Sequence, residues 1–376
     1  MSTVKILHCA DIHIGAAESF LKEKADSRRF ETLITFEKIV DLAKEHSVQV
    51  VALAGDILDS NNIEKTFIRR ILEKISQQKD IKFVFAAGNH DPLDFASPFK
   101  DTEIPENLYV LSTQGECIIF DDIKVNVFGK SFEGAFLKGT DKFNIQMPDN
   151  DYVNLMVQHG ELSSDLNSRY NAITQEFIKS SEMDYIALGH IHKRSQIGKL
   201  CDTYFAYSGC PEGQGFDELG QKGVYIGEIG KGSCLLEFIP VAKRLHICEK
   251  VDVTSVPQNE IADRVLSQLK EKYGEEFTDN LYKIVLTGSV SPESEASLAE
   301  IESRLNNALY FAKVVDKTEY LIDYEALSKE ASLKGIFVKN MISLIEKADE
   351  NQVSMYKNAL KIGLKAFNSE VGFNED

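Results

Sequence analysis

Short apolar runs alternate with longer amphipathic stretches in the first part of the chain. The runs at residues 4–9, 48–54 and 81–87 are typical of buried strands. Between them, residues 28–46 and 64–76 place apolar side chains at helical spacing, which predicts two helices. Strands that alternate with helices form βαβ crossovers and parallel sheets. The pattern therefore predicts an α/β arrangement, in which a ligand site lies at the carboxyl ends of the strands.

From about Asn107 the pattern becomes richer in strands. The run CIIFDDIKVNVFG predicts a hairpin that turns at Asp121 and Asp122. Further elements are predicted as strands at residues 152–160, 185–192, 204–209, 223–230 and 233–241, with a helix at 171–180. The fold class of the chain is therefore predicted to be α/β (α+β).

The segment PVAKR, at residues 240–244, separates two patterns. Residues 1–242 are predicted to form the first domain, and residues 243–320 a small β-α-β-α-β module without its own cluster of acids and histidines. Residues 321–376 have a helical pattern with apolar stripes. Such stripes either pack on their own domain or dock a partner protein, and both interpretations stay open.

The composition is that of an ordinary globular protein. The chain has 376 residues, of which 43% are hydrophobic and 27% charged, and its length suits two domains. No apolar run approaches the ~20 residues that cross a bilayer, and the start MSTVKILHC lacks the apolar core of a signal peptide. Six cysteines are scattered without CxxC pairs, which favours reduced thiols. A cytoplasmic protein without a membrane partner is expected.

The charge balance changes this picture. The chain has 59 acidic and 42 basic residues and a formal net charge of -17. A protein that binds nucleic acid through a broad electrostatic surface is usually basic. Either the substrate is not a polyanion, or bound cations and a partner protein supply the missing positive charge.

Five short motifs of acidic, amide and histidine residues follow apolar runs, and they contain five of the eight histidines of the chain. They are DIH at residues 11–13, GD at 55–56, GNHD at 88–91, QHG at 158–160 and GHIH at 189–192. At a strand end, residues two apart point to the same side, so Asp-x-His and His-x-His can each present two ligands to one point. Imidazole, carboxylate and carboxamide ligands suit manganese, iron or zinc. Seven such groups are too many for one tetrahedral ion and fit two ions that share a bridging carboxylate.

Each motif by itself also has an ordinary interpretation. Gly55 and Asp56 alone would be a strand that ends in a turn, and GNHD alone would be a tight turn. His8 shares the period of the first strand, so a packed or supporting role is favoured over ligation. The pairs at residues 28–29 and 193–194 are basic and could hold phosphates, although such pairs are common on solvated faces.

As a set, the motifs DIH, GDILD, GNHD, QHGE and GHIH resemble the signature of the calcineurin-like metallophosphoesterase superfamily over roughly the first 240 residues. The later segment YSGCPEGQGFDELGQKGVYIGEI resembles that of SbcD-type (YhaO-like) DNA repair exonucleases. The resemblance implies a β-sandwich flanked by helices, a small α/β capping domain and C-terminal helices. Two positions depart from some members: Asp59 stands where others have histidine, and Cys210 where others have serine.

The resemblance also assigns roles to the motif residues. It places Asp11, His13 and His192 on one metal ion and Asn89, His159 and His190 on the other, with Asp56 as the bridge. His90 is then free beside the pair and is predicted to be the catalytic residue that acts on the substrate. The expected cofactors are two divalent ions, with manganese favoured over iron, zinc, magnesium and cobalt.

The resulting hypothesis is a two-metal phosphodiesterase that hydrolyses DNA phosphodiester bonds in repair. Exonuclease activity is expected, and endonuclease activity stays open. The resemblance implies an SbcC-type coiled-coil ATPase as a partner, and a homodimer is a further option. The alternatives are a phosphoesterase for a small phosphodiester or nucleotide, a phosphoprotein phosphatase and a metal-free scaffold. Ser60 and Asp91 differ from the phosphatase motifs, and the complete ligand set disfavours a scaffold.

Overall fold

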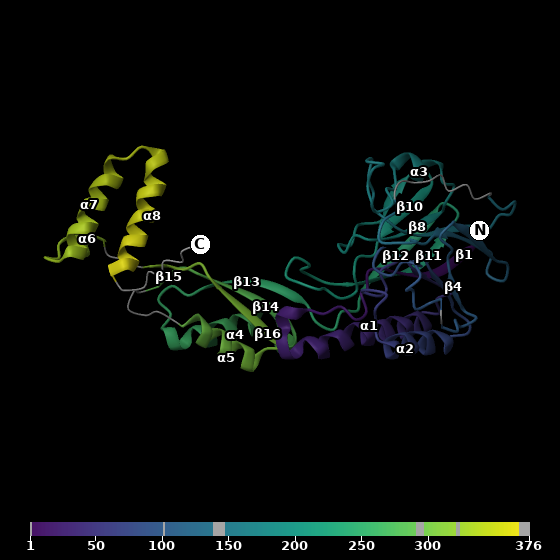
Figure 1. Cartoon of the computed structure of the whole chain (residues 1–376), viewed down its shortest axis with the longest axis horizontal. Helices are drawn as coiled ribbons and strands as arrows, with labels where there is room; N and C mark the ends of the chain where they lie inside the picture. The colour runs from purple at the N-terminus through teal and green to yellow at the C-terminus, as the bar shows by residue number, and fades with distance from the viewer. Residues whose placement is uncertain (1, 101, 138–146, 291–296, 321–323, 368–376) are drawn as a thin grey trace. The chain divides into compact units, whose positions relative to one another are not determined.

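The computed structural model describes the chain except residues 1, 101, 138–146, 291–296, 321–323 and 368–376. The contacts divide the chain into two compact units (Figure 1). The first comprises Met1–Cys248, Thr278–Lys283 and Leu309–Phe311. The second comprises Glu249–Phe277, Ile284–Ala308 and Ala312–Asp376. The predicted division into three parts at residues 242 and 320 stays a prediction.

One six-stranded sheet of the first unit contains the three strands predicted from the start of the chain. Its order is β12 (Ser233–Pro240), β11 (Gly223–Gly230), β1 (Thr3–Cys9), β2 (Val50–Leu53), β3 (Lys82–Phe85) and β4 (Leu108–Val110). Strands β1 to β4 are parallel, whereas β11 is antiparallel to β1. Helix α1 (Ala25–Glu45) connects β1 to β2, and α2 (Lys65–Ser76) connects β2 to β3, as predicted. A short 3-10 helix, η1 (Ser19–Lys24), precedes α1.

The second six-stranded sheet begins with the predicted hairpin. Its order is β5 (Glu116–Phe120), β6 (Val125–Lys130), β7 (Val153–His159), β8 (Tyr185–Gly189), β10 (Thr203–Tyr207) and β9 (Gly198–Leu200). Strands β5 and β6 pair antiparallel, and β6, β7, β8 and β10 run parallel. Helix α3 (Gln175–Ser180) packs on this sheet, because Ile178 belongs to the same buried cluster as Met156 and Ile186.

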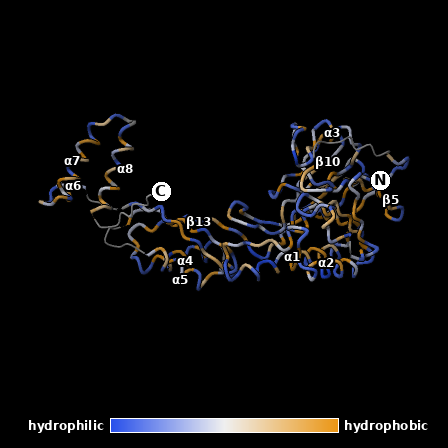
Figure 2. Tube along the Cα trace, in the orientation of Figure 1, coloured by the Kyte–Doolittle hydropathy of each residue, from blue (hydrophilic) through white to orange (hydrophobic). Residues whose placement is uncertain are grey.

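The main core lies between the two sheets. Ile6 of β1 and Leu155 of β7 belong to one buried cluster, which joins the facing surfaces of both sheets. The next residue of β1, Leu7, packs instead with Phe36 of α1 and Phe67 of α2, because side chains alternate between the faces of a strand. The first unit is therefore a β-sandwich flanked by helices, and its hydrophobic positions, orange in Figure 2, gather inside it.

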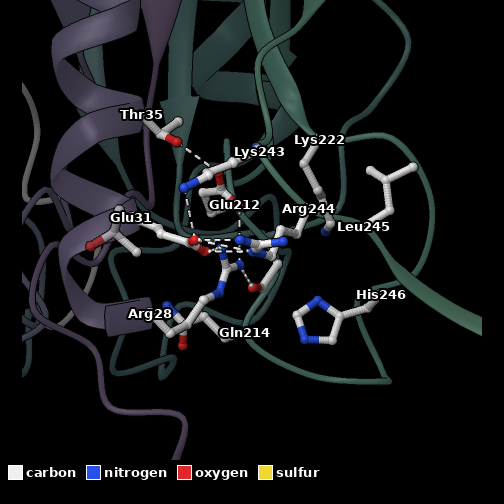
Figure 3. A network of polar contacts seen from close by, with 12 residues as sticks. Arg28, Glu31, Thr35, Glu212, Gln214, Lys222, Lys243, Arg244, Leu245 and His246 are labelled. Atoms are coloured by element: carbon white, nitrogen blue, oxygen red, sulfur yellow. Dashed lines mark hydrogen bonds and ion pairs between the residues drawn. The ribbon is translucent and has the colours of Figure 1, made fainter. Parts of the chain in front are cut away.

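A buried network of charged side chains ties α1 to the loop after β10 (Figure 3). Arg28 is 1% exposed and donates to Glu18 at 2.7 Å, Glu31 at 3.0 Å and Glu212 at 2.9 Å. Arg244 donates to the same Glu31 at 2.9 Å. We call these five residues the Arg28 network. Because its guanidinium is buried and bonded to three carboxylates, Arg28 does not offer the phosphate contact that was one of the two interpretations of the basic pair at residues 28–29.

The second unit contains most of the predicted β-α-β-α-β module, whose three strands each begin with residues of the first unit. Its strands β13 (His246–Asp252), β14 (Leu281–Thr287) and β16 (Phe311–Asp316) form a sheet in that order. The helices are α4 (Ile261–Tyr273) and α5 (Leu298–Ala308), with short 3-10 turns η2 (Gln258–Glu260) and η3 (Glu275–Asp279). Two short strands, β15 (Ser289–Val290) after β14 and β17 (Glu319–Tyr320) after β16, pair in parallel with each other.

The chain ends in the helices α6 (Tyr324–Ser328), α7 (Leu333–Lys347) and α8 (Glu350–Phe367). They share a small apolar core of their own, formed by Val338, Met341, Leu360 and Leu364. Ser332 caps the start of α7 by accepting a hydrogen bond from the N–H of Gly335 at 3.0 Å. Within the described residues, no helix is both long and apolar enough to cross a membrane.

Candidate metal centre

The five motifs lie at or directly after the carboxyl ends of five strands of the sandwich. Strands β1, β2 and β3 of one sheet and β7 and β8 of the other lead into them. Asp11, His13, Asp56 and His190 all have positive φ, at 53°, 50°, 51° and 100°. Such backbone costs about 1–3 kcal/mol per residue and is typical of functional sites.

This backbone corrects the reason that the sequence suggested for the paired ligands. Strand β1 ends at Cys9 and β8 at Gly189, so neither Asp-x-His nor His-x-His lies on a strand. Left-handed turns after the strand ends, rather than the alternation of strand side chains, bring the paired residues to one place.

The first cluster contains Asp11, His13 and His192. The Nε2 atoms of His13 and His192 are 3.1 Å apart, although the two residues are separated by most of the first unit in sequence. One ligand atom from each of the three residues lies within 4.8 Å of the others. These three side chains can therefore hold one ion.

The second cluster adjoins the first through Asp56. Asn89 Oδ1 lies 3.1 Å from His159 Nε2 and 3.2 Å from His190 Nδ1. Asp56 Oδ2 lies 3.3 Å from His159 Nε2 and 3.9 Å from His13 Nε2, so its carboxylate faces both clusters. The structure thus brings together all seven residues predicted as ligands, which we call the candidate centre. Their assignment to particular ions stays a prediction.

Two buried carboxylates make this cluster fit metal ions. Asp11 is fully buried and Asp56 is 2% exposed. In the described part of the chain, neither carboxylate forms an ion pair with a lysine or arginine. Burial, together with the neighbouring Asp56, raises the pKa of Asp11. Because buried charges need compensation, a divalent cation among imidazole, carboxylate and carboxamide donors is the natural partner.

His159 is oriented by the backbone of a neighbouring loop. Its Nδ1 donates to the carbonyl of Ala54 at 2.9 Å, which turns Nε2 towards Asn89 and Asp56. Burial would lower the pKa of His159, but the charge and hydrogen bond of Asp56, together with the charge of Asp11, outweigh burial and raise that pKa to about 9. Without metal, a protonated His159 therefore balances part of the carboxylate charge.

The glycines of two motifs are required by close packing. At Gly55, with φ of +86°, a Cβ atom would lie 2.4 Å from His159 Nδ1. At Gly88, it would lie 2.2 Å from Asp56 Oδ1. A side chain at either position would displace a residue of the candidate centre, which explains why the apolar run at β2 stops on Gly-Asp.

His90 borders the candidate centre from an exposed position. Its backbone N–H donates to Asp56 Oδ1 at 2.8 Å, and its Nδ1 lies 3.0 Å from the carbonyl of Asp59. Its ring centre is 4.7 Å from that of His13. The Asp59 carboxylate lies 3.3 Å from His13 Nδ1. His90 thus reaches both solvent and the centre, and its action on substrate stays a prediction.

Asp91 is a structural residue of the site that the sequence interpretation missed. It is fully buried and accepts hydrogen bonds from the N–H groups of Gly88 at 2.7 Å, Ile57 at 2.6 Å, Leu58 at 3.1 Å and Asp56 at 3.2 Å. Burial and the neighbouring Asp56 raise its pKa to about 6. These hydrogen bonds hold the loop of Gly55 and Asp56 against the loop that contains Asp91. The only signal in the sequence was its place as the last letter of GNHD.

Glu218 was missed as well. Its Oε1 lies 2.5 Å from His192 Nδ1, and its Oε2 accepts from the N–H of Gln214 at 3.0 Å. Burial would raise the pKa of Glu218, but the hydrogen bond and charge of His192, together with the N–H of Gln214 and the charge of Lys222, outweigh burial and lower that pKa to about 2. Carboxylates commonly orient metal-binding histidines in this way. Its signal was an acidic residue in the segment that resembled SbcD.

His8 has the packed role that its period predicted. Its Nε2 donates to the carbonyl of Leu188 at 3.0 Å, and its Nδ1 accepts from the hydroxyl of Tyr185 at 2.9 Å. Burial lowers its pKa to about 4, so the ring is neutral and occupied on both sides.

A helix-flanked β-sandwich with these donors at its strand ends has the architecture of a metal-dependent enzyme. The sequence model of the family described as calcineurin-like phosphoesterase matches residues 4–194, about half of the chain, and the chain belongs to that family. Members of this family use a dinuclear metal centre, and the two adjoining clusters are candidates for it.

Curated relatives resemble the chain at low identity. The metallophosphoesterase YhaO of Bacillus subtilis, described as uncharacterized, is 26% identical over 305 residues, which cover 78% of this chain and 74% of YhaO. The DNA double-strand break repair protein Mre11 of Methanopyrus kandleri is 26% identical, over 65% of this chain and 59% of its own. The SbcD component of the nuclease SbcCD of Escherichia coli K12 is 24% identical, over 58% of this chain and 63% of its own. The protein is therefore a metal-dependent phosphoesterase.

Proposed function

We propose that the protein is a DNA repair nuclease that hydrolyses phosphodiester bonds with two divalent ions. The observation that carries this proposal is the meeting of seven donor groups in one cluster, with the carboxylate of Asp56 facing both halves. The relatives named for double-strand break repair and for nuclease activity support DNA as the substrate. Exonuclease action is the primary expectation, and endonuclease action stays open.

The side chains divide the chemistry between them. Two divalent ions, when bound, activate a water molecule for in-line attack and neutralise charge on the phosphoryl oxygens. Asp11, His13 and His192 would hold one ion and Asn89, His159 and His190 the other, with Asp56 between them. Oxygen and nitrogen donors without thiolate favour manganese, with iron, zinc, magnesium and cobalt as alternatives.

His90 is proposed to act on the substrate. Its ring is exposed, next to the candidate centre, and its backbone is fixed by the bond to Asp56. From this position it can stabilise charge on the phosphoryl group or give a proton to the departing sugar oxygen.

A comparison of three substrates tests the proposed function. Purified protein with manganese is assayed on labelled linear duplex DNA, labelled single-stranded DNA and bis-p-nitrophenyl phosphate, with Asp56→Asn as the inactive control. Cleavage of DNA and of the small diester, both lost in the control, is the expected result. Hydrolysis of the small diester without any cleavage of DNA would instead support the alternative of a small phosphodiester or nucleotide substrate.

A partner protein is proposed to dock on the C-terminal helices. Leu333 and Ile336 of α7 are 73% and 57% exposed, and Met355 and Ile362 of α8 are 58% and 62% exposed. The net charge of -17 also suggests that another protein provides much of the DNA affinity. A coiled-coil ATPase of the SbcC type is the proposed partner, because one relative is named as a component of SbcCD.

Surface variants test the docking proposal. Leu333→Glu with Ile336→Glu is expected to abolish co-purification with the ATPase while hydrolysis of bis-p-nitrophenyl phosphate continues. Lys339→Glu, an exposed change on the same helix, serves as the control. Retained co-purification in the double variant would rule out this surface. Sedimentation of the purified chain measures whether it also forms a homodimer.

A further inference from the structure

A small cavity lies beside the candidate centre, between the loop after β8 and the segment before β11. Its volume is about 170 Å³, and His192 forms part of its wall. Lys193, Arg194, Lys222 and Phe238 are among the other lining residues. The cavity therefore shares one residue with the candidate centre and is otherwise lined by groups that the proposed chemistry does not use.

The cavity is fixed in position relative to His192. The carbonyl of His192 accepts hydrogen bonds from the N–H of Cys210 at 3.2 Å and from Lys222 Nζ at 3.3 Å. At Gly209, with φ of +71°, a Cβ atom would lie 2.7 Å from the backbone nitrogen of Arg194, so the two walls are in close contact. A ligand in the cavity would thus be held at a set place beside the centre.

Positive charge dominates the cavity. Lys193 and Arg194 are exposed, and within the described residues neither forms an ion pair with a carboxylate. Lys222 is 8% exposed, and its nearest carboxylate is Glu218 at 4.0 Å, which is already bonded to His192. Three cationic residues therefore line the cavity, with one carboxylate within 4.0 Å of Lys222. Because the chain has 59 acidic and only 42 basic residues, this excess of cations is unusual for the molecule.

Arg194 is held in an orientation that suits an anion. Its guanidinium carbon lies 3.9 Å from the centre of the Phe238 ring, so one face is stacked on an aromatic side chain. Stacking leaves the N–H groups at the edge of the guanidinium available for two parallel hydrogen bonds to phosphate oxygens. A solvated surface arginine has no such fixed position, which separates this site from an ordinary charged face.

We propose that this cavity binds a second phosphate of the substrate, namely the phosphodiester next to the one that is hydrolysed. This inference rests on the proposed function, because it requires a polynucleotide substrate. Lys193 and Arg194 contact that phosphate directly, and Lys222 contributes charge from the wall. The site would then favour DNA over a small diester, which has no neighbouring phosphate.

A double-variant comparison tests this inference. Oligonucleotides of one sequence are prepared with native linkages, or with one uncharged methylphosphonate linkage on either side of the cleaved bond. For the wild-type protein, removal of one of these two charges is expected to lower kcat/KM by about tenfold or more, the usual weight of a charged hydrogen bond. The combined change Lys193→Gln and Arg194→Gln is expected to lower kcat/KM on native DNA by a similar factor, mainly through KM.

The decisive result is the coupling between the two changes. In the Lys193→Gln, Arg194→Gln variant, the methylphosphonate is expected to cause no further loss. Lys79→Gln, an exposed change in the turn before β3, is expected to keep the wild-type difference. A methylphosphonate penalty that persists in the double variant, or that is absent in the wild type, would overturn the inference. Hydrolysis of bis-p-nitrophenyl phosphate without cleavage of any oligonucleotide would overturn the proposed function and this occupant together.

Discussion

Two clusters in the first unit bury carboxylates, and they neutralise them differently. The Arg28 network joins Glu18, Glu31 and Glu212 to two guanidinium groups, with bonds of 2.7 to 3.0 Å around Arg28. The candidate centre buries Asp11 and Asp56 as deeply but, among the described residues, offers them only histidines. The carboxylates of the Arg28 network are paired with arginines of the protein itself, whereas those of the candidate centre need cations from solution.

The difference separates a structural role from a functional one. Arg28 has its donors engaged, so no substrate can reach it, and the cluster holds α1 against the segment around Glu212. The candidate centre instead combines left-handed backbone at four of its residues with carboxylates whose charge the protein balances only in part. Such an arrangement is unfavourable without ligands and is therefore expected where a protein binds metal.

The largest predicted effect concerns the residue proposed to act on substrate. His90→Asn is expected to lower turnover by about 10² to 10⁴-fold, the usual contribution of a positioned acid or base, and to leave the manganese content unchanged. His190→Ala is the contrasting variant and is expected to lose metal. Turnover is measured on bis-p-nitrophenyl phosphate and metal by elemental analysis. Loss of metal in His90→Asn would make His90 a ligand.

The next effect tests the structural cluster. Arg28→Met leaves buried glutamates without their central cation and is expected to lower the free energy of unfolding by about 3–5 kcal/mol. Arg29→Met is the matched control, because Arg29 is partly exposed and its ion pair with Glu64 is 3.8 Å long, so a loss of at most about 1 kcal/mol is expected. Both are measured by urea denaturation of the metal-free protein. Equal losses of unfolding free energy in the two variants would show that the buried ion pairs of Arg28 stabilise the fold no more than the exposed ion pair of Arg29 does.

A smaller effect is expected at the residue that orients His192. Glu218→Ala should weaken the binding of manganese by about 10 to 100-fold, as is usual when a partner of a metal-binding histidine is removed. Glu218→Gln keeps an acceptor and should lose less. Glu228→Ala, an exposed change on β11, is the control. Calorimetric titration gives the affinities, and an unchanged affinity in Glu218→Ala would show that the contact with His192 has no influence on the metal.

The sequence predicted the helices, the strands and the ligand residues of the candidate centre, but it did not predict the turns that orient those residues. Apolar periodicity located α1, α2 and the parallel strands, because burial on a sheet face leaves a local pattern. The seven residues of the candidate centre were found because each follows an apolar run. The turns that aim them were not, since positive φ at Asp11 or His190 leaves no mark in residue type.

Long-range contacts were the other part that the sequence could not provide. Arg28 was grouped with Arg29 as a basic pair, and nothing local indicated that Glu212 lies against it. Glu218 likewise contacts His192 only through the return of the chain after β10. Asp91 was visible in its motif, but its bonds to the GD loop depend on the pairing of β2 with β3.

The metal content of the purified protein tests the central claim most directly. Protein reconstituted with excess manganese and then desalted is analysed for manganese per chain, beside the Asp56→Asn variant. Two ions per chain in the wild type, with a clear loss in Asp56→Asn, is the result expected if Asp11, Asp56 and the donors around them form a shared dinuclear centre. A single ion per chain in the wild type, or an unchanged content in Asp56→Asn, would contradict it.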